Sequence, residues 1–158
     1  MDVMILPENL YFVDATIEDH FRAMSLIHAL GWRDTYVGYV PDEYMAREIT
    51  DTRWVNQFRE DYQTGRCRGL LLYRGSTPVA CVNYGPARTK NLNAGQPSSF
   101  PNDAYQGWGE IISFYTHPAE RGKGYGGLLF EEAVNRLKAA GHQNAFVFVL
   151  RENEKARR

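Results

Sequence analysis

Cysteine is scarce in this chain. There are two cysteines in 158 residues, Cys67 and Cys81, and they form no CxxC pair and have no histidine at zinc-ligand spacing. A disulfide framework or a zinc finger is therefore excluded as the basis of the fold. Cys81 stands in an apolar, strand-like pattern, which predicts a buried thiol. The 4 histidines are scattered, so we predict no metal site.

The chain also lacks a strong charge of either sign and a long apolar run. A net charge of −1 gives no basic field, so we expect no nucleic-acid partner. No apolar segment approaches the roughly 20 residues that span a bilayer, so we expect no membrane partner. Residues 1–13 contain no Lys or Arg and are interrupted by Pro7, which argues against a secretory signal. We expect one domain in the cytoplasm.

The N-terminal third has helical spacing after a first strand. Residues 10–14 have a strand pattern, and residues 17–30 carry apolar side chains on one helical face. Thr16 and Asp19 resemble a capping box, and Gly31 is expected to end this helix. Pro41 can open a second helix. A third helix is expected after Asp51, with four apolar or aromatic side chains on one face: Trp54, Val55, Phe58 and Tyr62.

The rest of the chain alternates strands with one helix. Residues 69–73 and 79–84 predict a hairpin around a turn at 75–78, and residues 85–108 predict a long loop. A strand at 110–116 precedes a helix that Gly141 closes, and a buried central strand is expected at 145–150. This order predicts an α+β fold with a mixed sheet. The strand–helix–strand unit makes the last two strands parallel.

A glycine loop lies between the strand at 110–116 and the following helix: Arg121-Gly122-Lys123-Gly124-Tyr125-Gly126-Gly127. Glycine lets backbone N–H groups approach a ligand and permits positive φ. The N-terminus of the helix adds free N–H donors and partial positive charge. Together with two basic side chains, these features predict a phosphate or pyrophosphate site.

Two other phosphate-binding motifs fit the loop less well. Gly122, Gly124 and Gly127 match the spacing of a dinucleotide fingerprint, but there the first glycine follows its strand almost directly, and here five residues intervene. A P-loop is excluded because Lys123 is followed by glycine and not by Ser or Thr.

These residues resemble the GNAT superfamily of acetyl-CoA-dependent N-acetyltransferases. Its cofactor motif, Arg/Gln-x-x-Gly-x-Gly/Ala, is met by Arg121, Gly124 and Gly126. Residues 111–118 resemble that family's fourth strand, and residues 153–158 resemble the start of its Asn-x-x-Ala helix. Residues 32–41 are similar to a segment that lines the acceptor side in one bacterial branch. The resemblance implies a mostly antiparallel, twisted mixed sheet flanked by helices, in a single acetyltransferase domain over residues 1–158.

The resemblance also implies acetyl transfer from acetyl-CoA to the amine of a small molecule or peptide by direct attack in a ternary complex. The loop residues would hold the pyrophosphate, and the backbone of Phe114, Tyr115 and Thr116 would pair with pantetheine as an extra strand. Amide N–H groups there would polarise the thioester carbonyl, and Asn153 would contact the pantetheine arm. The loop contributors are Arg121, Gly122, Lys123, Gly124, Tyr125, Gly126 and Gly127.

The acceptor amine arrives protonated, because its pKa is near ~10, so the chemistry needs a base. Glu110, at the start of the strand that would receive pantetheine, is our candidate, directly or through water. An ordinary carboxylate at a strand end is the alternative interpretation. Trp32, Tyr36 and Tyr84 are candidate acceptor contacts, with ordinary packing as the alternative. His28 is a weaker candidate of the same kind.

The sequence departs from the family pattern at its end. Family members usually continue with Phe-Tyr and two further strands, and that Tyr commonly protonates the leaving thiolate. We therefore expect a C-terminally incomplete domain that lacks those strands, with an open edge at 145–150 that favours homodimerisation. A non-catalytic acyl-CoA-binding module on the same fold is the alternative function, and a nucleotide-binding oxidoreductase is the third.

Overall fold

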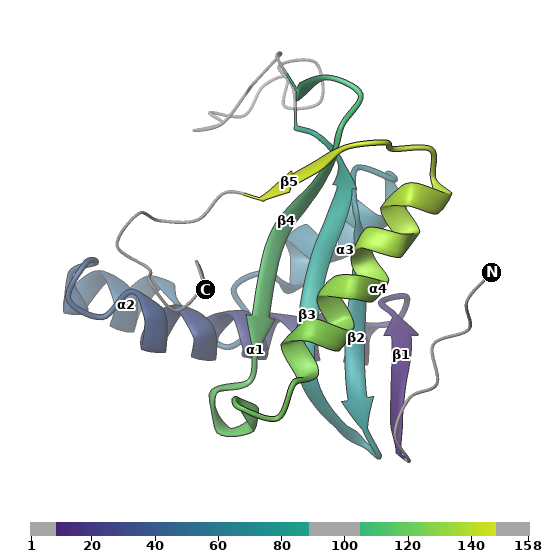
Figure 1. The fold of residues 1–158 in the computed structure, drawn as a ribbon. Coiled ribbons are helices and arrows are strands. Elements are labelled where there is room, and N and C mark those ends of the chain that lie inside the picture. The colour runs from purple at the N-terminus through teal and green to yellow at the C-terminus, as the bar shows by residue number, and fades with distance from the viewer. Residues whose placement is uncertain (1–8, 89–104, 148–158) are drawn as a thin grey trace.

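A computed structural model describes residues 9–88 and 105–147. Its sheet has five strands in the order β1-β2-β3-β4-β5, as Figure 1 shows. The first four strands are antiparallel, and β5 pairs with β4 in parallel. The α+β fold, the mixed sheet and the parallel pair are therefore confirmed. The strands are β1 Leu10–Asp14, β2 Arg68–Arg74, β3 Thr77–Pro86, β4 Gly109–Thr116 and β5 Ala145–Val147.

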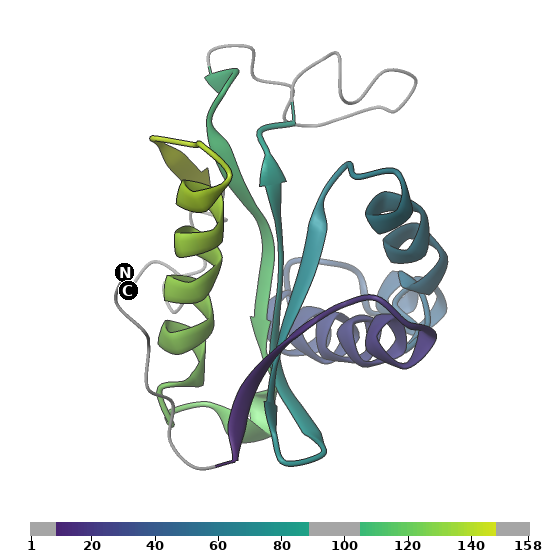
Figure 2. The same ribbon diagram turned by 90° about the vertical axis from the view of Figure 1, so that its right-hand side faces the viewer.

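Helices cover both faces of this sheet. Figure 2 shows α4 on one side and the three N-terminal helices on the other. Apolar side chains of α4 pack on alternate residues of β2, β3 and β4, while α1 and α3 pack on the opposite set. We call these the α4 face and the α1/α3 face. The helices are α1 Glu18–Thr35, α2 Asp42–Glu48, α3 Val55–Gln63 and α4 Tyr125–Ala139.

Helix α1 differs from the prediction at both ends. Ile17 is its N-cap and no side chain caps it, so the Thr16–Asp19 capping box is wrong. The N–H of Thr16 instead donates to Nδ1 of His20. The helix continues through Gly31 because that glycine is buried beneath an aromatic ring. A Cβ there would lie 2.3 Å from Cδ1 of Tyr115, so the absence of a side chain allows close approach and does not end the helix.

The two short helices begin close to where the sequence places them. Pro41 is the N-cap of α2, so the helix starts one residue later than predicted. Trp54, and not Asp51, is the N-cap of α3. Its backbone N–H donates to Oγ of Ser25 at 3.1 Å, which ties α3 to α1.

The two predicted glycine turns are confirmed. The β2–β3 hairpin turns at Gly75 and Ser76, with Arg74 opposite Thr77, so the turn is tighter than predicted. Gly75 has φ of 61°, and Gly141, just after α4, has φ of 98°. L-residues with side chains rarely adopt such angles, so both positions favour glycine.

The predicted burial of the last strand is wrong over the residues described. Ala145 and Val147 of β5 are exposed and Phe146 is half-buried, and Val147 keeps 48% of its surface. This strand pairs with β4 along one side over only three residues. Residues 148–150 of the predicted strand lie outside the described residues.

Candidate functional site

The glycine loop connects β4 to α4 through a short 3₁₀ turn, Pro118–Glu120. Gly122 and Gly124 have φ of 83° and 81°, in the left-handed region that glycine favours. Gly124 is the N-cap of α4, and its carbonyl accepts from the N–H of Leu128 at 3.3 Å. The predicted loop and helix start are confirmed, and both glycines have open space where a Cβ would stand.

The start of α4 has the features of an anion site. Its first turn contains no acidic residue, so the partial positive charge of the helix end is not neutralised within the helix. A Cβ on Gly126 would meet Oγ1 of Thr116 at 3.2 Å, whereas a Cβ on Gly127 would meet nothing within 4 Å. Gly126 thus lets the helix lie against β4, and the N–H groups of this first turn have no acceptor within the helix.

The basic residues of the loop already have acidic partners. Lys123 Nζ lies 2.9 Å from Glu120, and Arg74 binds the same carboxylate with both terminal nitrogens. Arg121 pairs with Asp34 of α1. Hydrogen bonds from Arg74 and then from Lys123 lower the pKa of Glu120 to about 2. These pairs join the loop to β2 and to α1, so they hold the loop in place.

Over the part of the chain that the structure describes, residues 112–116 of β4 form a free edge beside the glycine loop. Within the described residues, β5 pairs with β4 only at Gly109–Ile111, the first three residues of β4, and Figure 1 shows β5 beside that end of β4. The β3 register shifts there as well, because Asn83 faces Ser113 while Tyr84 faces Ile111. Ile112 is therefore a bulge residue. Residues 112–116 keep backbone groups that a further extended chain can pair with.

The predicted pantetheine residues lie on both faces of β4. Phe114 contacts the ring of Phe130 on α4, and Thr116 lies against Gly126. Tyr115 faces α1, where burial raises the pKa of its hydroxyl and it interacts with Tyr36 and Trp32. Their shared backbone edge, and not their side chains, is what the three residues can offer an extended ligand.

A chain of polar side chains crosses the α1/α3 face behind β4. His28 Nε2 lies 2.8 Å from Oγ of Ser113, and His28 Nδ1 lies 2.7 Å from the carbonyl oxygen of Met24. Asn83 donates from Nδ2 to the same Ser113 oxygen at 2.9 Å and accepts from the hydroxyl of Tyr62. Burial lowers the pKa of His28 to about 4, so the ring is neutral at pH 7.

Glu110, the predicted base, lies in a buried ion pair. It is 1% exposed, and both of its carboxylate oxygens accept from the guanidinium of Arg88, at 2.6 to 3.1 Å. The backbone N–H of Arg88 adds a further bond at 3.0 Å. The alternative interpretation, an ordinary surface carboxylate, does not hold. Glu110 is therefore a buried carboxylate, and the guanidinium of Arg88 bonds both of its oxygens.

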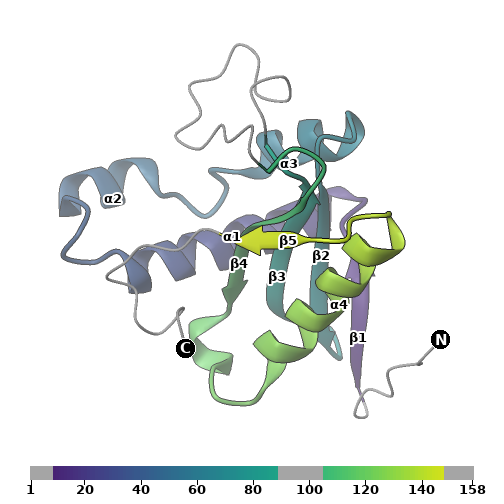
Figure 3. The same cartoon turned by 45° about the horizontal axis from the view of Figure 1, so that its top comes forward.

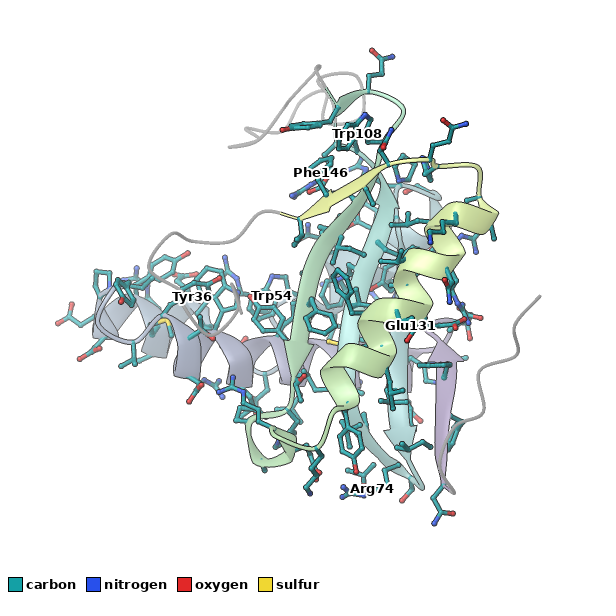
Figure 4. The ribbon with its side chains drawn as sticks, viewed as in Figure 1. Tyr36, Trp54, Arg74, Trp108, Glu131 and Phe146 are labelled. Atoms are coloured by element: carbon teal, nitrogen blue, oxygen red, sulfur yellow. The ribbon has the colours of Figure 1, made fainter. Side chains whose placement is uncertain are left out.

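The aromatic acceptor candidates separate into two groups. Trp32 and Tyr36 are half-buried on α1 and its C-cap with ring centroids 4.6 Å apart, and Trp54 lies 6.2 Å from Trp32. Figure 4 shows Tyr36 and Trp54 near one another beside β4. Tyr84 lies elsewhere, 5% exposed in the core beneath α4. Its position corrects our prediction that it contacts the acceptor.

Sequence reasoning missed Ser113, Asn83 and Arg88. A signal was present for the first two, because each is a polar residue inside an otherwise apolar strand pattern. Arg88 gave no such signal, since it lies in the segment that we predicted as loop. Asn153, the remaining predicted contact, lies outside the described residues.

Comparison with known proteins identifies the family of this chain. The model of the "Acetyltransferase (GNAT) family" matches residues 32–158. The chain belongs to the GNAT acetyltransferase family. The predicted family resemblance is thus confirmed. No curated protein sequence matches the chain.

Solved GNAT structures share the fold at low identity. PaiA N-acetyltransferase from Thermoplasma acidophilum, solved in complex with coenzyme A, is 15% identical with a TM-score of 0.66, over 93% of this chain and 83% of that one. An N-acetyltransferase from Staphylococcus aureus is 19% identical with a TM-score of 0.66, over 94% and 78%. A GNAT acetyltransferase from Brucella melitensis, in complex with acetyl-CoA, is 15% identical with a TM-score of 0.58, over 93% and 80%.

The described residues contain neither a metal-binding group nor a membrane-spanning helix. Among residues 9–88 and 105–147, no three Asp, Glu, His or Cys side chains are grouped so that they could hold a metal ion. The helices in those ranges are also too short or too polar to cross a bilayer.

Proposed function

We propose that this chain transfers the acetyl group of acetyl-CoA to an amine of a small molecule or peptide, by direct attack in a ternary complex. The observation that carries the proposal is the adjacency of two binding elements. The N-terminus of α4 offers N–H donors that the helix itself does not use to a pyrophosphate, and the edge of β4 that no described residue pairs with ends beside it. Together they fit a ligand that is anionic at one end and extended, with amide groups, at the other.

Each part of the cofactor has a proposed contact. The backbone of Gly122–Gly127 would receive the pyrophosphate, with Arg121 and Lys123 beside it. The edge at residues 114–116 would pair with the amides of pantetheine, and Asn153 would contact the same arm. When bound, acetyl-CoA supplies the activated thioester. N–H groups at the bulge then stabilise negative charge that develops on its carbonyl oxygen.

The acceptor would approach from the α1/α3 face. Trp32 and Tyr36 lie on that side of β4 and present half-buried aromatic surface. Glu110 is also on this face, since Gly109 next to it faces Leu137 of α4 and side chains alternate along a strand. For Glu110 to take the proton of the amine, Arg88 must release one of the carboxylate oxygens, or a water molecule must bridge the amine and the carboxylate. Positioning of the two reactants supplies the rest of the rate.

Calorimetric titration with acetyl-CoA tests the cofactor assignment. Gly124→Glu places a carboxylate where the pyrophosphate would lie and forces a side chain into φ of 81°. We expect wild-type binding and a loss of at least about 100-fold in affinity for this variant. Gly141→Glu is the matched control, because Gly141 also has positive φ but lies at the opposite end of α4. It should bind as the wild type does.

Further titrants separate this function from its alternatives. Titration with NADH should show no binding, and binding of NADH in place of acetyl-CoA would favour the oxidoreductase.

A panel of amines with a thiol assay for released coenzyme A then tests turnover. If the chain binds acetyl-CoA but no amine in a broad panel causes release of coenzyme A, the result would favour the non-catalytic module. With an active amine, Glu110→Gln should lower kcat by at least about 100-fold and leave acetyl-CoA binding unchanged.

A further inference from the structure

We propose that Ser113 is itself an acyl acceptor, whose hydroxyl takes the acetyl group from acetyl-CoA when no amine occupies the site. This activity rests on the proposed function only in its source of acetyl groups. It is carried by Ser113 and the carbonyl of Met24, which were not predicted as site residues, and by His28, which was predicted only as a weaker acceptor contact. They have the relationship of a nucleophile, its base and the group that orients the base.

The distances within this triad are those of strong hydrogen bonds. Ser113 Oγ and His28 Nε2 are 2.8 Å apart, and His28 Nδ1 and the Met24 oxygen are 2.7 Å apart. Because a carbonyl can only accept, Nδ1 must carry the proton and Nε2 must be the acceptor. The hydroxyl of Ser113 therefore donates to Nε2. A serine whose proton already points at a neutral imidazole is in the state that nucleophilic attack requires.

The neighbouring groups fix this proton arrangement. Asn83 donates from Nδ2 to Ser113 Oγ at 2.9 Å, so one lone pair of that oxygen is occupied and its own proton is directed away from Asn83. The hydroxyl of Tyr62 donates to Oδ1 of Asn83 and so sets the orientation of the amide. Each donor in the chain from Tyr62 to Met24 has a different acceptor, so the whole chain has one consistent direction.

Ser113 also lies where an acyl group would be delivered. It follows the bulge at Ile112, two residues beyond Ile111, which pairs with Val147, the last described residue of β5. An extended arm along residues 114–116, entering from the glycine loop, ends at this point. Of the three side chains His28, Asn83 and Ser113, the first two are 3% exposed, whereas Ser113 is only partly buried. Ser113 is therefore more exposed than the two side chains that bond to its hydroxyl.

The step balances within these groups. Oγ of Ser113 forms a bond to the acetyl carbon while the carbon–sulfur bond of the thioester breaks. The hydroxyl proton moves to Nε2 of His28 and then to the departing thiolate, which leaves as free coenzyme A. The product is O-acetylserine at position 113. Water that later attacks the ester takes the acetyl group as acetate and returns a proton to Oγ.

Cys81, a stronger nucleophile in water, is not the acceptor. Its sulfur lies 3.4 Å from Nδ1 of His28, but that nitrogen donates to Met24 and cannot take a proton from the thiol. Cys81 is 0% exposed at the centre of the sheet, and burial raises the pKa of the thiol. Ser113 is therefore the nucleophile that His28 can serve.

Mass spectrometry of the intact protein tests the proposal without a known amine. The chain is incubated with acetyl-CoA, and separately with p-nitrophenyl acetate, an acyl donor that needs no cofactor site. We expect one acetyl group per chain, mapped to Ser113 by peptide sequencing. Cys81→Ala is the matched control and should be labelled as the wild type is. Ser113→Ala should lose the label, and circular dichroism with acetyl-CoA titration checks that this variant is folded.

Two further variants test the roles of the two residues. Ser113→Cys should be labelled through a thioester, so its label becomes removable by neutral hydroxylamine. His28→Gln can accept the hydrogen bond of Ser113 but cannot take its proton. We therefore expect labelling about 100-fold slower with acetyl-CoA affinity unchanged. Labelling of His28→Gln at the wild-type rate would show that His28 only packs there.

The remaining outcomes separate this proposal from the proposed function. If acetyl-CoA binds but Ser113 is never labelled, or only lysines and the N-terminus are labelled equally in Ser113→Ala, Ser113 is not an acyl acceptor and the cofactor assignment stands. If p-nitrophenyl acetate labels Ser113 while acetyl-CoA neither binds to the chain nor labels it, Ser113 is confirmed as a nucleophile. Acetyl-CoA is then overturned as the donor, and the proposed function with it.

Discussion

The two faces of the sheet differ in chemistry although the same three strands build both. The α4 face is an apolar core to which Leu70, Leu72 and Val82 contribute, closed by Leu129 of α4. The α1/α3 face contains or adjoins the four buried polar residues of residues 9–88 and 105–147, which are Ser25, His28, Asn83 and Glu110. Figure 3 shows the sheet between the helices that cover these faces. A buried polar group costs free energy unless it is hydrogen-bonded.

The difference indicates where stability and chemistry lie. On the α4 face, alternating apolar residues are sufficient for packing. On the α1/α3 face, His28, Asn83, Ser113 and Tyr62 bond to one another, and Glu110 bonds to Arg88. A satisfied polar network of this kind fixes one arrangement of side chains. It also stands beside the free edge of β4, where the proposed reaction takes place.

The largest expected effect is on the α4 face. Leu129→Ala removes a side chain that is 0% exposed and leaves a cavity between α4 and the sheet. We expect the free energy of unfolding to fall by about 3 to 4 kcal/mol, measured by urea denaturation. Glu131→Ala, at an exposed position of the same helix, is the control and should stay within about 0.5 kcal/mol. A loss below about 1 kcal/mol for Leu129→Ala would mean that this face is not the main core.

The next effect is a pH dependence that belongs to the α1/α3 face. Burial lowers the pKa of His28 from 6.5 to about 4. The unfolded chain therefore binds a proton that the folded chain refuses between those values, and stability falls as pH decreases through this window. We expect His28 to account for about 3 kcal/mol between pH 7 and pH 4. The other titratable groups against its ring, Cys81 and Tyr115, have raised pKa values and stay neutral there.

Denaturation curves at several pH values measure this effect. His28→Gln should flatten the profile between pH 4 and pH 6.5, because the glutamine does not titrate. His142→Gln is the control, since His142 is a half-buried residue whose ring bonds the carbonyl of Gly107. It should leave the shape of the profile unchanged. An equally steep profile in His28→Gln would place the titrating group elsewhere.

Much of the fold was predictable from local signals. The glycine loop and the tight hairpin depend on residues close in sequence, such as Gly75 and Gly124, whose backbone angles match the prediction. The parallel pair followed from the strand–helix–strand order. The burial of Cys81 followed from its apolar neighbours and is confirmed.

The site was less predictable because its partners are far apart in sequence. His28 and Ser113 are separated by 85 residues, and no local sequence pattern predicts their hydrogen bond. Glu110 was predicted as the base from its place on β4, but its pairing with Arg88, 22 residues away in the sequence, has no local signal. Tyr84 was misplaced although the alternation of Ala80, Val82 and Tyr84 along β3 puts it on the α4 face. A sequence pattern does not reveal the bulge at Ile112, which shifts the register between β3 and β4.

The smallest expected effect compares two helical glycines, one from each side of the sheet. Alanine at either position gains about 1 kcal/mol of helix propensity. At Gly31 the new Cβ would meet three ring carbons of Tyr115 at 2.3, 2.9 and 3.0 Å, and such overpacking costs about 1 to 3 kcal/mol. We therefore expect Gly31→Ala to lower the free energy of unfolding by about 1 kcal/mol. Gly127→Ala has open space and should raise it by about 0.5 to 1 kcal/mol. Urea denaturation of both variants measures the difference, and a stabilised Gly31→Ala would mean that the Tyr115 ring moves aside without cost.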